Sequence, residues 1–133
     1  MLPSSQRLRL RRDFGLATRC GHRAASGTVV VHLARVTDEL AGGRQDVHVD
    51  DPARVGFVVS RACGPAVTRN RVRRRLRHLM LPRLPELPLG IVLVVRALPA
   101  AASASTERLD ADLTRCLTRC LSRLVPATVA VHS

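Results

Sequence analysis

The residue types best suited to bind phosphate lie in one arginine-rich segment near the middle of the chain. Residues 52–85 contain nine arginines and no aspartate or glutamate. If residues 65–80 form a helix, successive side chains are rotated by about 100° and separate into two faces. The apolar face holds Val72, Leu76, Leu79 and Met80, and the opposite face holds Asn70, Arg73, Arg74 and Arg77, flanked by Arg71 and His78. The second face suits phosphate groups, because the planar guanidinium donates hydrogen bonds to two oxygens at once.

The acidic residues do not form a pattern typical of a metal-dependent nuclease. Such an enzyme holds its metal ions with several carboxylates gathered at one place. Asp50 and Asp51 are adjacent but lie in a predicted loop, and Asp110 and Asp112, two apart in a predicted helix, face different directions. The sequence therefore predicts no catalytic residue and no metal site in the protein itself.

The cysteines are also not arranged as a metal site. They form no Cys-x-x-Cys pair and no Cys–His cluster with the spacing of a zinc site. The four residues are Cys20, Cys63, Cys116 and Cys120. We expect reduced thiols that pack as small apolar side chains, and without a secretion signal we expect no disulfides.

The overall charge indicates a polyanionic partner. The chain has 133 residues, typical of one domain, and its 22 basic residues, all arginine, outnumber 10 acidic ones to give +12. Hydrophobic residues make up 46%, which argues against a disordered basic tail. The longest apolar run, residues 91–95, is too short to cross a membrane. Because residues 1–12 lead into no apolar stretch, we expect no signal peptide and a cytoplasmic protein.

The pattern of residues predicts a single α+β domain, an α/β sandwich with one central sheet. Helices are expected at 12–20, from Pro65 to about Met80, and from Ser105 or Thr106 to Pro126. Strands are expected at 28–36, 54–60 and 90–97, the last in the centre of the sheet. Residues 37–52 read as a loop that could hide one more strand at 44–49. We expect the domain to span 1–125 and a flexible tail to follow at 126–133.

One segment carries a specific resemblance to a known family. Residues 60–77 read Ser-Arg-Ala-Cys-Gly-Pro-Ala-Val-Thr-Arg-Asn-Arg-Val-Arg-Arg-Arg-Leu-Arg. This run resembles the signature of the bacterial ribonuclease P protein subunit, in which a small-residue turn precedes Arg-Asn-Arg and further basic residues on a helix. Residues 1–9, Asp13 with Phe14, the strand 55–60, residues 92–96 and the last helix are similar in order, so the resemblance covers about residues 1–124.

The resemblance implies an accessory subunit of an endoribonuclease whose chemistry is carried by an RNA. That RNA, with Mg²⁺ bound mainly by the RNA, removes the 5′ leader of precursor tRNA, and we expect one protein per RNA. The family fold includes a left-handed crossover. Positions implied to face the catalytic RNA are Arg61, Arg69, Asn70, Arg71, Arg73, Arg74 and Arg77. Positions implied to line a cleft for the single-stranded leader are Phe14, Thr18 and His32.

The leader cleft departs from the family pattern and leaves some roles open. Thr18 and His32 stand where aromatic residues are frequent in the family, and Phe14 and Phe57 are the two aromatic residues of the chain. Phe14 fits a core role or a base contact, His32 could be a surface histidine without function, and Phe57 is expected in the core.

Three other functions compete with this reading. A nuclease made of protein alone would need clustered carboxylates. A structural RNA-binding protein of ribosomal type would share the basic charge. A DNA-binding helix-turn-helix would need a short helix before the basic one, whereas a strand is predicted there.

Overall fold

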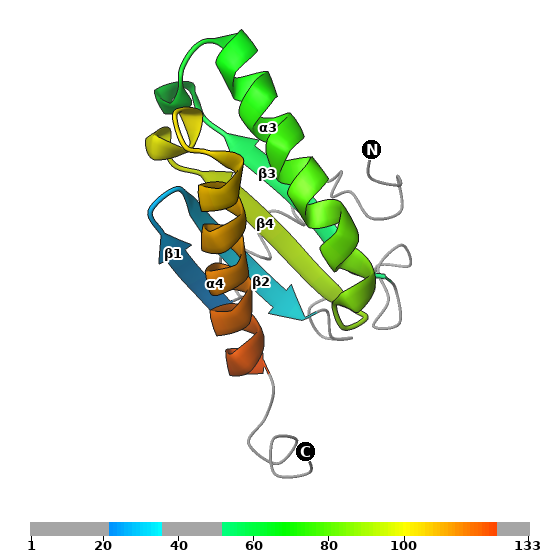
Figure 1. The fold of residues 1–133 in the computed structure, drawn as a ribbon. Helices are drawn as coiled ribbons and strands as arrows, with labels where there is room; N and C mark the ends of the chain where they lie inside the picture. The colour runs from blue at the N-terminus through cyan, green and yellow to red at the C-terminus, as the bar shows by residue number, and fades with distance from the viewer. Residues whose placement is uncertain (1–21, 36–51, 125–133) are drawn as a thin grey trace.

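A four-stranded sheet carries two helices on one of its faces in the computed structural model, which describes residues 22–35 and 52–124 (Figure 1). The strand order is β1-β2-β4-β3. The strands are β1 (His22–Ser26), β2 (Val29–Arg35), β3 (Arg54–Val59) and β4 (Ile91–Ala97). The helices are α3 (Ala66–Met80) and α4 (Thr106–Leu124), with short 3-10 helices η2 (Arg61–Cys63), η3 (Leu81–Glu86) and η4 (Pro99–Ala102).

The sheet is mixed, because one of its strand pairs is parallel. β1 and β2 form an antiparallel hairpin and β2 pairs antiparallel with β4, whereas β3 and β4 are parallel and are joined through α3. Seen from the helix side with β3 and β4 pointing upward, β4 lies to the left of β3 (Figure 1). This crossover is therefore left-handed, as the resemblance implied, although right-handed crossovers dominate among proteins.

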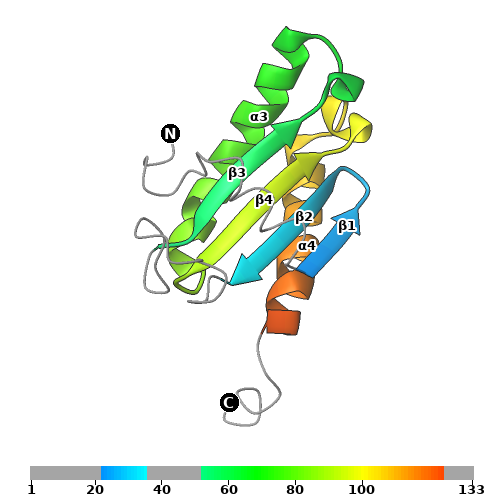
Figure 2. The ribbon, with the colours of Figure 1, turned by 180° about the vertical axis from the view of Figure 1, so that it is seen from behind.

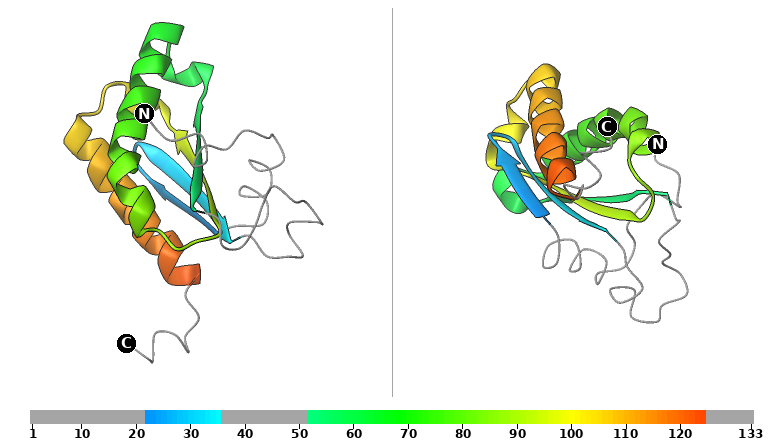
Figure 3. Two further views of the ribbon diagram at one scale, coloured as in Figure 1. Left: turned by 90° about the vertical axis from the view of Figure 1, so that its right-hand side faces the viewer. Right: turned by 90° about the horizontal axis from the view of Figure 1, so that it is seen from below.

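The core lies between the two helices and one face of the sheet (Figure 3). Alternate residues of β2 and β4 point toward the helices, because side chains alternate along a strand. They are Val29, Val31, Leu33, Ile91, Leu93 and Val95, and all are fully or almost fully buried. They pack against Val72, Leu76 and Met80 of α3 and against Leu109, Leu113, Cys116 and Cys120 of α4. Figure 2 shows the opposite face of the sheet, on which neither α3 nor α4 packs.

Several predictions about the elements are confirmed. β2, β3, β4, α3 and α4 lie where the sequence pattern places them, and β4 is central. Pro65 precedes α3 as its N-cap rather than lying in its first turn. At the start of α4 the Ser105 hydroxyl accepts a hydrogen bond from the backbone N–H of Arg108. The predicted helix at 12–20, the tail at 126–133 and all but residue 52 of the predicted loop 37–52, including its possible strand at 44–49, lie outside the described residues.

β1 was not predicted from the sequence, and the predicted order of elements is wrong at that point. The segment His-Arg-Ala-Ala-Ser has no β-branched residue, and it is an edge strand that pairs on one side only. Its conformation is fixed by its neighbour β2 through the Gly27-Thr28 turn. In the described part of the chain, no helix is long and apolar enough to cross a membrane.

A buried carboxylate joins α4 to the hairpin turn. The Asp112 carboxylate accepts hydrogen bonds from the Thr28 backbone N–H at 3.1 Å, the Thr28 hydroxyl at 2.6 Å and the Ser26 hydroxyl at 2.9 Å. Arg108 Nε donates to it at 3.1 Å. Burial raises the pKa of Asp112, but these hydrogen bonds outweigh it and lower the pKa to about 2. Asp112 is therefore ionised at neutral pH and fixes α4 to the β1–β2 turn.

Candidate nucleic-acid interface

The turn between β3 and α3 sets the direction of the basic helix. After β3, residues 61–63 form η2 and the chain turns at Gly64. Gly64 has a φ of +127°, which other residues rarely adopt, and a Cβ there would lie 3.3 Å from the side chain of Thr68. Pro65 follows as the N-cap of α3, where its missing N–H is not needed by the helix.

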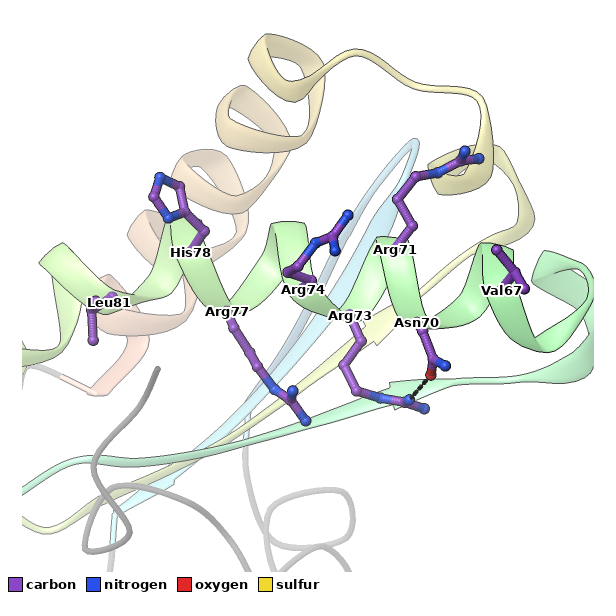
Figure 4. Close-up of a pocket in the computed structure, with 8 residues that line it drawn as sticks. All are labelled: Val67, Asn70, Arg71, Arg73, Arg74, Arg77, His78 and Leu81. Atoms are coloured by element: carbon purple, nitrogen blue, oxygen red, sulfur yellow. Dashed lines mark hydrogen bonds between the residues drawn. The ribbon is translucent and has the colours of Figure 1, made fainter.

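The two predicted faces of α3 are confirmed. Val72, Leu76 and Met80 are fully buried and Leu79 is half-buried against the core. On the other side the helix carries a basic band, defined here as Asn70, Arg71, Arg73, Arg74 and Arg77. These five residues, with Val67, His78 and Leu81, line one surface hollow along the helix (Figure 4).

The basic band consists of two rows that run along the helix. In Figure 4, Asn70, Arg73 and Arg77 point to one side, and Arg71, Arg74 and His78 point to the other. Both rows follow the spacing i, i+3, i+7, which places side chains above one another on a helix. A ligand with regularly repeated negative charges could therefore contact several guanidinium groups at once.

The arginines of the basic band have no acidic partner within residues 22–35 and 52–124. The two ion pairs of that part of the chain join Arg83 to Asp110 and Arg108 to Asp112. Within the band, Arg73 Nη1 donates a hydrogen bond to the Asn70 side-chain oxygen at 3.1 Å (Figure 4). Like charges at this spacing repel one another. An anionic ligand would remove this repulsion.

Other arginines of the same segment have structural roles. Arg69 Nε donates to the carbonyl of Gly64 at 3.2 Å, and Arg75 Nη1 donates to the carbonyl of Ala104 at 3.1 Å. Arg83 binds the Asp110 carboxylate at 2.6 Å and the carbonyl of Leu79 at 3.1 Å. These contacts join α3 to the turn before it, to the segment before α4 and, through η3, to α4 itself.

The structure groups most, but not all, of the predicted RNA-facing residues. Asn70, Arg71, Arg73, Arg74 and Arg77 lie together. Arg61, exposed in η2, and Arg69, half-buried beside the turn, do not line the hollow. Val67 and Leu81 were missed, although Val67 is three residues before Asn70 and therefore shares its side of the helix.

His32 lies on the face of the sheet opposite the helices. It is half-buried on β2, where it is paired with Arg23 of β1 and Val94 of β4. Burial lowers the pKa of His32, and the positive charges of Arg96 and Arg23 lower it further. The imidazole is therefore neutral at pH 7 and offers one hydrogen-bond donor and one acceptor.

The other residues predicted for the leader cleft, Phe14 and Thr18, lie outside the described residues. Phe57 packs against the core as expected, on the helix side of β3.

The described cysteines pack as small apolar residues, as predicted. Cys63, Cys116 and Cys120 are buried in the core. Burial raises the pKa of the Cys116 thiol, and it raises that of Cys120 to about 11. Within residues 22–35 and 52–124, no three His, Cys, Asp or Glu side chains come together as metal ligands.

Comparison with known proteins finds one consistent family. A family model described as "Ribonuclease P" matches residues 2–121. The "Ribonuclease P protein component" of Salinispora tropica is 51% identical over 125 residues, covering 85% of this chain and 88% of that protein. The protein of the same description from Streptomyces bikiniensis is 50% identical over 118 residues, covering 88% and 93%.

Solved structures agree with this result. The Staphylococcus aureus RNase P protein superposes with a TM-score of 0.69 at 25% identity, covering 85% of this chain and 93% of that one. The RNase P protein from Thermotoga maritima gives a TM-score of 0.64 at 26% identity, covering 82% and 92%.

Proposed function

Because the chain belongs to the ribonuclease P protein family, we propose that its basic band binds the catalytic RNA and that this RNA carries out the cleavage. The family makes the chain a subunit of ribonuclease P that acts in tRNA 5′ processing. The comparisons give no support to the alternative of a ribosomal-type structural protein. The division of work between protein and RNA is our proposal.

The observation that carries this proposal is that the basic band has no acidic partner among the described residues. A charged helix face that serves only solubility usually carries both basic and acidic residues. Here Arg71, Arg73, Arg74 and Arg77 lie on one helix without an ion pair to any described carboxylate. Phosphate groups of a folded RNA would supply the missing negative charge, and each guanidinium could bind two phosphate oxygens. Arg61 and Arg69 would extend this contact at the start of the helix.

The opposite face of the sheet supports a separate site for the single-stranded leader. His32 is neutral at pH 7 and half-buried, so it could stack on a base and hydrogen-bond to its edge. Val30 and Val94 beside it are apolar, and Arg96 and Arg23 provide positive charge. Phe14 and Thr18 would complete this cleft according to the family resemblance.

Mg²⁺ in this scheme is held mainly by the RNA. The basic band offers guanidinium groups, which cannot ligate a cation, and one amide oxygen on Asn70. Mg²⁺ bound to RNA phosphates would supply activation of water and stabilisation of the leaving oxygen. We further propose one protein per RNA, precursor tRNA as substrate, and a location in the cytoplasm.

The proposal is tested by separating the protein from the RNA. Purified protein, treated with nuclease to remove bound RNA, is incubated with 5′-labelled precursor tRNA in Mg²⁺, with and without a transcribed ribonuclease P RNA. We expect leader release with the RNA and none without it. Leader release by the protein alone would show that the protein carries the chemistry.

The leader cleft is tested on the assembled enzyme. Replacing His32 by Ala should weaken binding of precursor tRNA more than binding of mature tRNA, because only the precursor has a leader. Thr118→Ala, an exposed change on the helix side of the protein, serves as the control. Equal losses for both tRNAs would contradict a leader contact by His32.

A further inference from the structure

Helix α4 carries its arginines on one side, together with the buried Asp112. With about 100° per residue, its four arginines, at positions 108, 115, 119 and 123, fall within about 80° of the helix circumference. The other exposed side carries Glu107, Asp110, Thr114 and Thr118. Arg108 is neutralised by Asp112. The remaining three form what we call the α4 edge surface: Arg115, Arg119 and Arg123.

The α4 edge surface is held in place by the outer strand of the sheet. Arg115 Nη1 donates to the Ser26 hydroxyl at 3.1 Å, and Arg123 Nη1 donates to the carbonyl of Arg23 at 2.8 Å. Both partners are uncharged, so the guanidinium groups keep their positive charge while their motion is restricted. Arg119 lies between them, about 6 Å along the axis from each, because four residues rise by that amount.

No described carboxylate forms an ion pair with Arg115, Arg119 or Arg123. This arrangement resembles that of the basic band on α3, but it lies elsewhere on the molecule. α3 lies beside β3 at one edge of the sheet, whereas α4 covers β1 and β2 at the other edge (Figures 1 and 3). The protein thus presents two arginine surfaces at opposite edges of one rigid sheet.

We propose that the α4 edge surface binds the sugar–phosphate backbone of double-helical RNA, independently of the basic band. A ligand for three arginines in a row must carry regularly repeated negative charge, which the RNA backbone does. The exposed large apolar residues of the described chain are Val67, Leu81 and Leu89, and none lies on α4. A membrane-binding helix and the centre of a protein–protein interface both need such apolar groups. One protein molecule could therefore hold two RNA segments at a fixed distance.

The test counts how many short RNA duplexes one protein molecule binds. The full chain is titrated at low salt with a 12-base-pair RNA duplex, and the stoichiometry is measured by sedimentation equilibrium and native mass spectrometry. We expect two duplexes per wild-type chain and one for Arg119→Gln/Arg123→Gln. Arg73→Gln/Arg74→Gln should also bind one duplex, because it removes the basic band instead.

A charge-matched pair of single variants isolates the position of the charge. Arg119→Gln and Thr118→Glu each lower the net charge by one at neighbouring residues, but on different sides of α4. The association constant K of the second duplex falls as the salt concentration rises. Arg119→Gln should reduce the magnitude of the slope of log K against log salt concentration by about 0.9, the value for one lost phosphate contact. Thr118→Glu should leave this slope unchanged. Within residues 22–35 and 52–124 the Arg119 side chain forms no hydrogen bond that its replacement would break. Folding, followed by circular dichroism, should therefore be intact.

The possible outcomes separate this proposal from the proposed function. A wild-type chain that binds a single duplex, or an Arg119→Gln/Arg123→Gln chain that still binds two, would overturn the second surface. Equal effects of Arg119→Gln and Thr118→Glu would attribute binding to net charge and would also overturn it. If the α4 variant loses one duplex while Arg73→Gln/Arg74→Gln keeps both, the second surface is supported and the role of the basic band is wrong.

Discussion

Replacing Asp112 by Asn should destabilise the protein in a way that depends on pH. The carboxylate is almost completely buried and accepts hydrogen bonds from Ser26, Thr28 and Arg108. Lowering the pKa of a carboxyl group from 3.8 to about 2 corresponds to about 2 kcal/mol of folding free energy at neutral pH. The amide of Asn also places an N–H group opposite the hydrogen-bond donors of Ser26, Thr28 and Arg108. The free energy of unfolding at pH 7 should therefore fall by about 2–4 kcal/mol in total.

The sign of the pH dependence follows from the direction of the pKa change. Because the folded-state pKa lies below the unfolded one, the stabilisation is fully present well above pH 3.8 and is lost as pH falls through 3.8 toward about 2. The difference in unfolding free energy between wild type and Asp112→Asn should therefore shrink by about 2 kcal/mol between pH 6 and pH 2.

The difference in unfolding free energy between wild type and Asp112→Asn is measured by urea denaturation, followed by circular dichroism, at a series of pH values. Taking the difference removes the titration of the other acidic residues, which both proteins share. Asp110→Asn is the control, since Asp110 is half exposed and pairs with Arg83 near the surface, where an ion pair contributes about 1 kcal/mol or less. If the difference in unfolding free energy between wild type and Asp112→Asn stays constant from pH 6 to pH 2, the charge of Asp112 does not stabilise the fold.

Four further predictions concern the basic helix, the turn before it and the leader. Arg73→Ala should leave thermal stability nearly unchanged. In titrations of the catalytic RNA at several salt concentrations, it should lower the magnitude of the slope of log K against log salt concentration by about 1. A variant that unfolds but keeps its RNA affinity per folded molecule would contradict this prediction. Leu76→Ala, one turn away on the buried face, should instead destabilise the fold by about 2–5 kcal/mol in urea denaturation. Gly64→Ala should destabilise it by about 1–3 kcal/mol, because φ is +127° there. Phe14→Ala should weaken binding of precursor tRNA more than mature tRNA, and a collapse of folding would show that Phe14 is a core residue.

The position and the two faces of α3 could be predicted because they depend on local periodicity. A helix repeats every 3.6 residues, so the separation of Val72 and Leu76 from Arg73 and Arg77 is visible in the sequence. The buried run in β4 is visible in the same way, since a central strand is apolar on both faces. The expected contacts of the basic band with RNA and of His32 with the leader stay predictions.

The features that sequence reasoning missed depend on contacts between distant residues. β1 contains no β-branched residue and is fixed by its pairing with β2. Arg75 and Arg83 read as part of the basic cluster, but their partners, Ala104 and Asp110, follow them by 29 and 27 residues. Helical periodicity leaves Arg75 and Arg83 off the basic face, but no local pattern in the sequence identifies the distant groups that they bind.

The bond between Asp112 and the hairpin turn also sets an order of events during synthesis. Thr28 and Asp112 are 84 residues apart. At about 5–20 residues per second, the ribosome needs about 4–17 s to add that length of chain. During this interval α4 is not complete and cannot cover the apolar side of β1 and β2, although β4 is made before the interval ends. We therefore expect the hairpin to become stable only after α4 has emerged, so that a chain stopped before α4 would expose Val29, Val31 and Leu33 to other proteins.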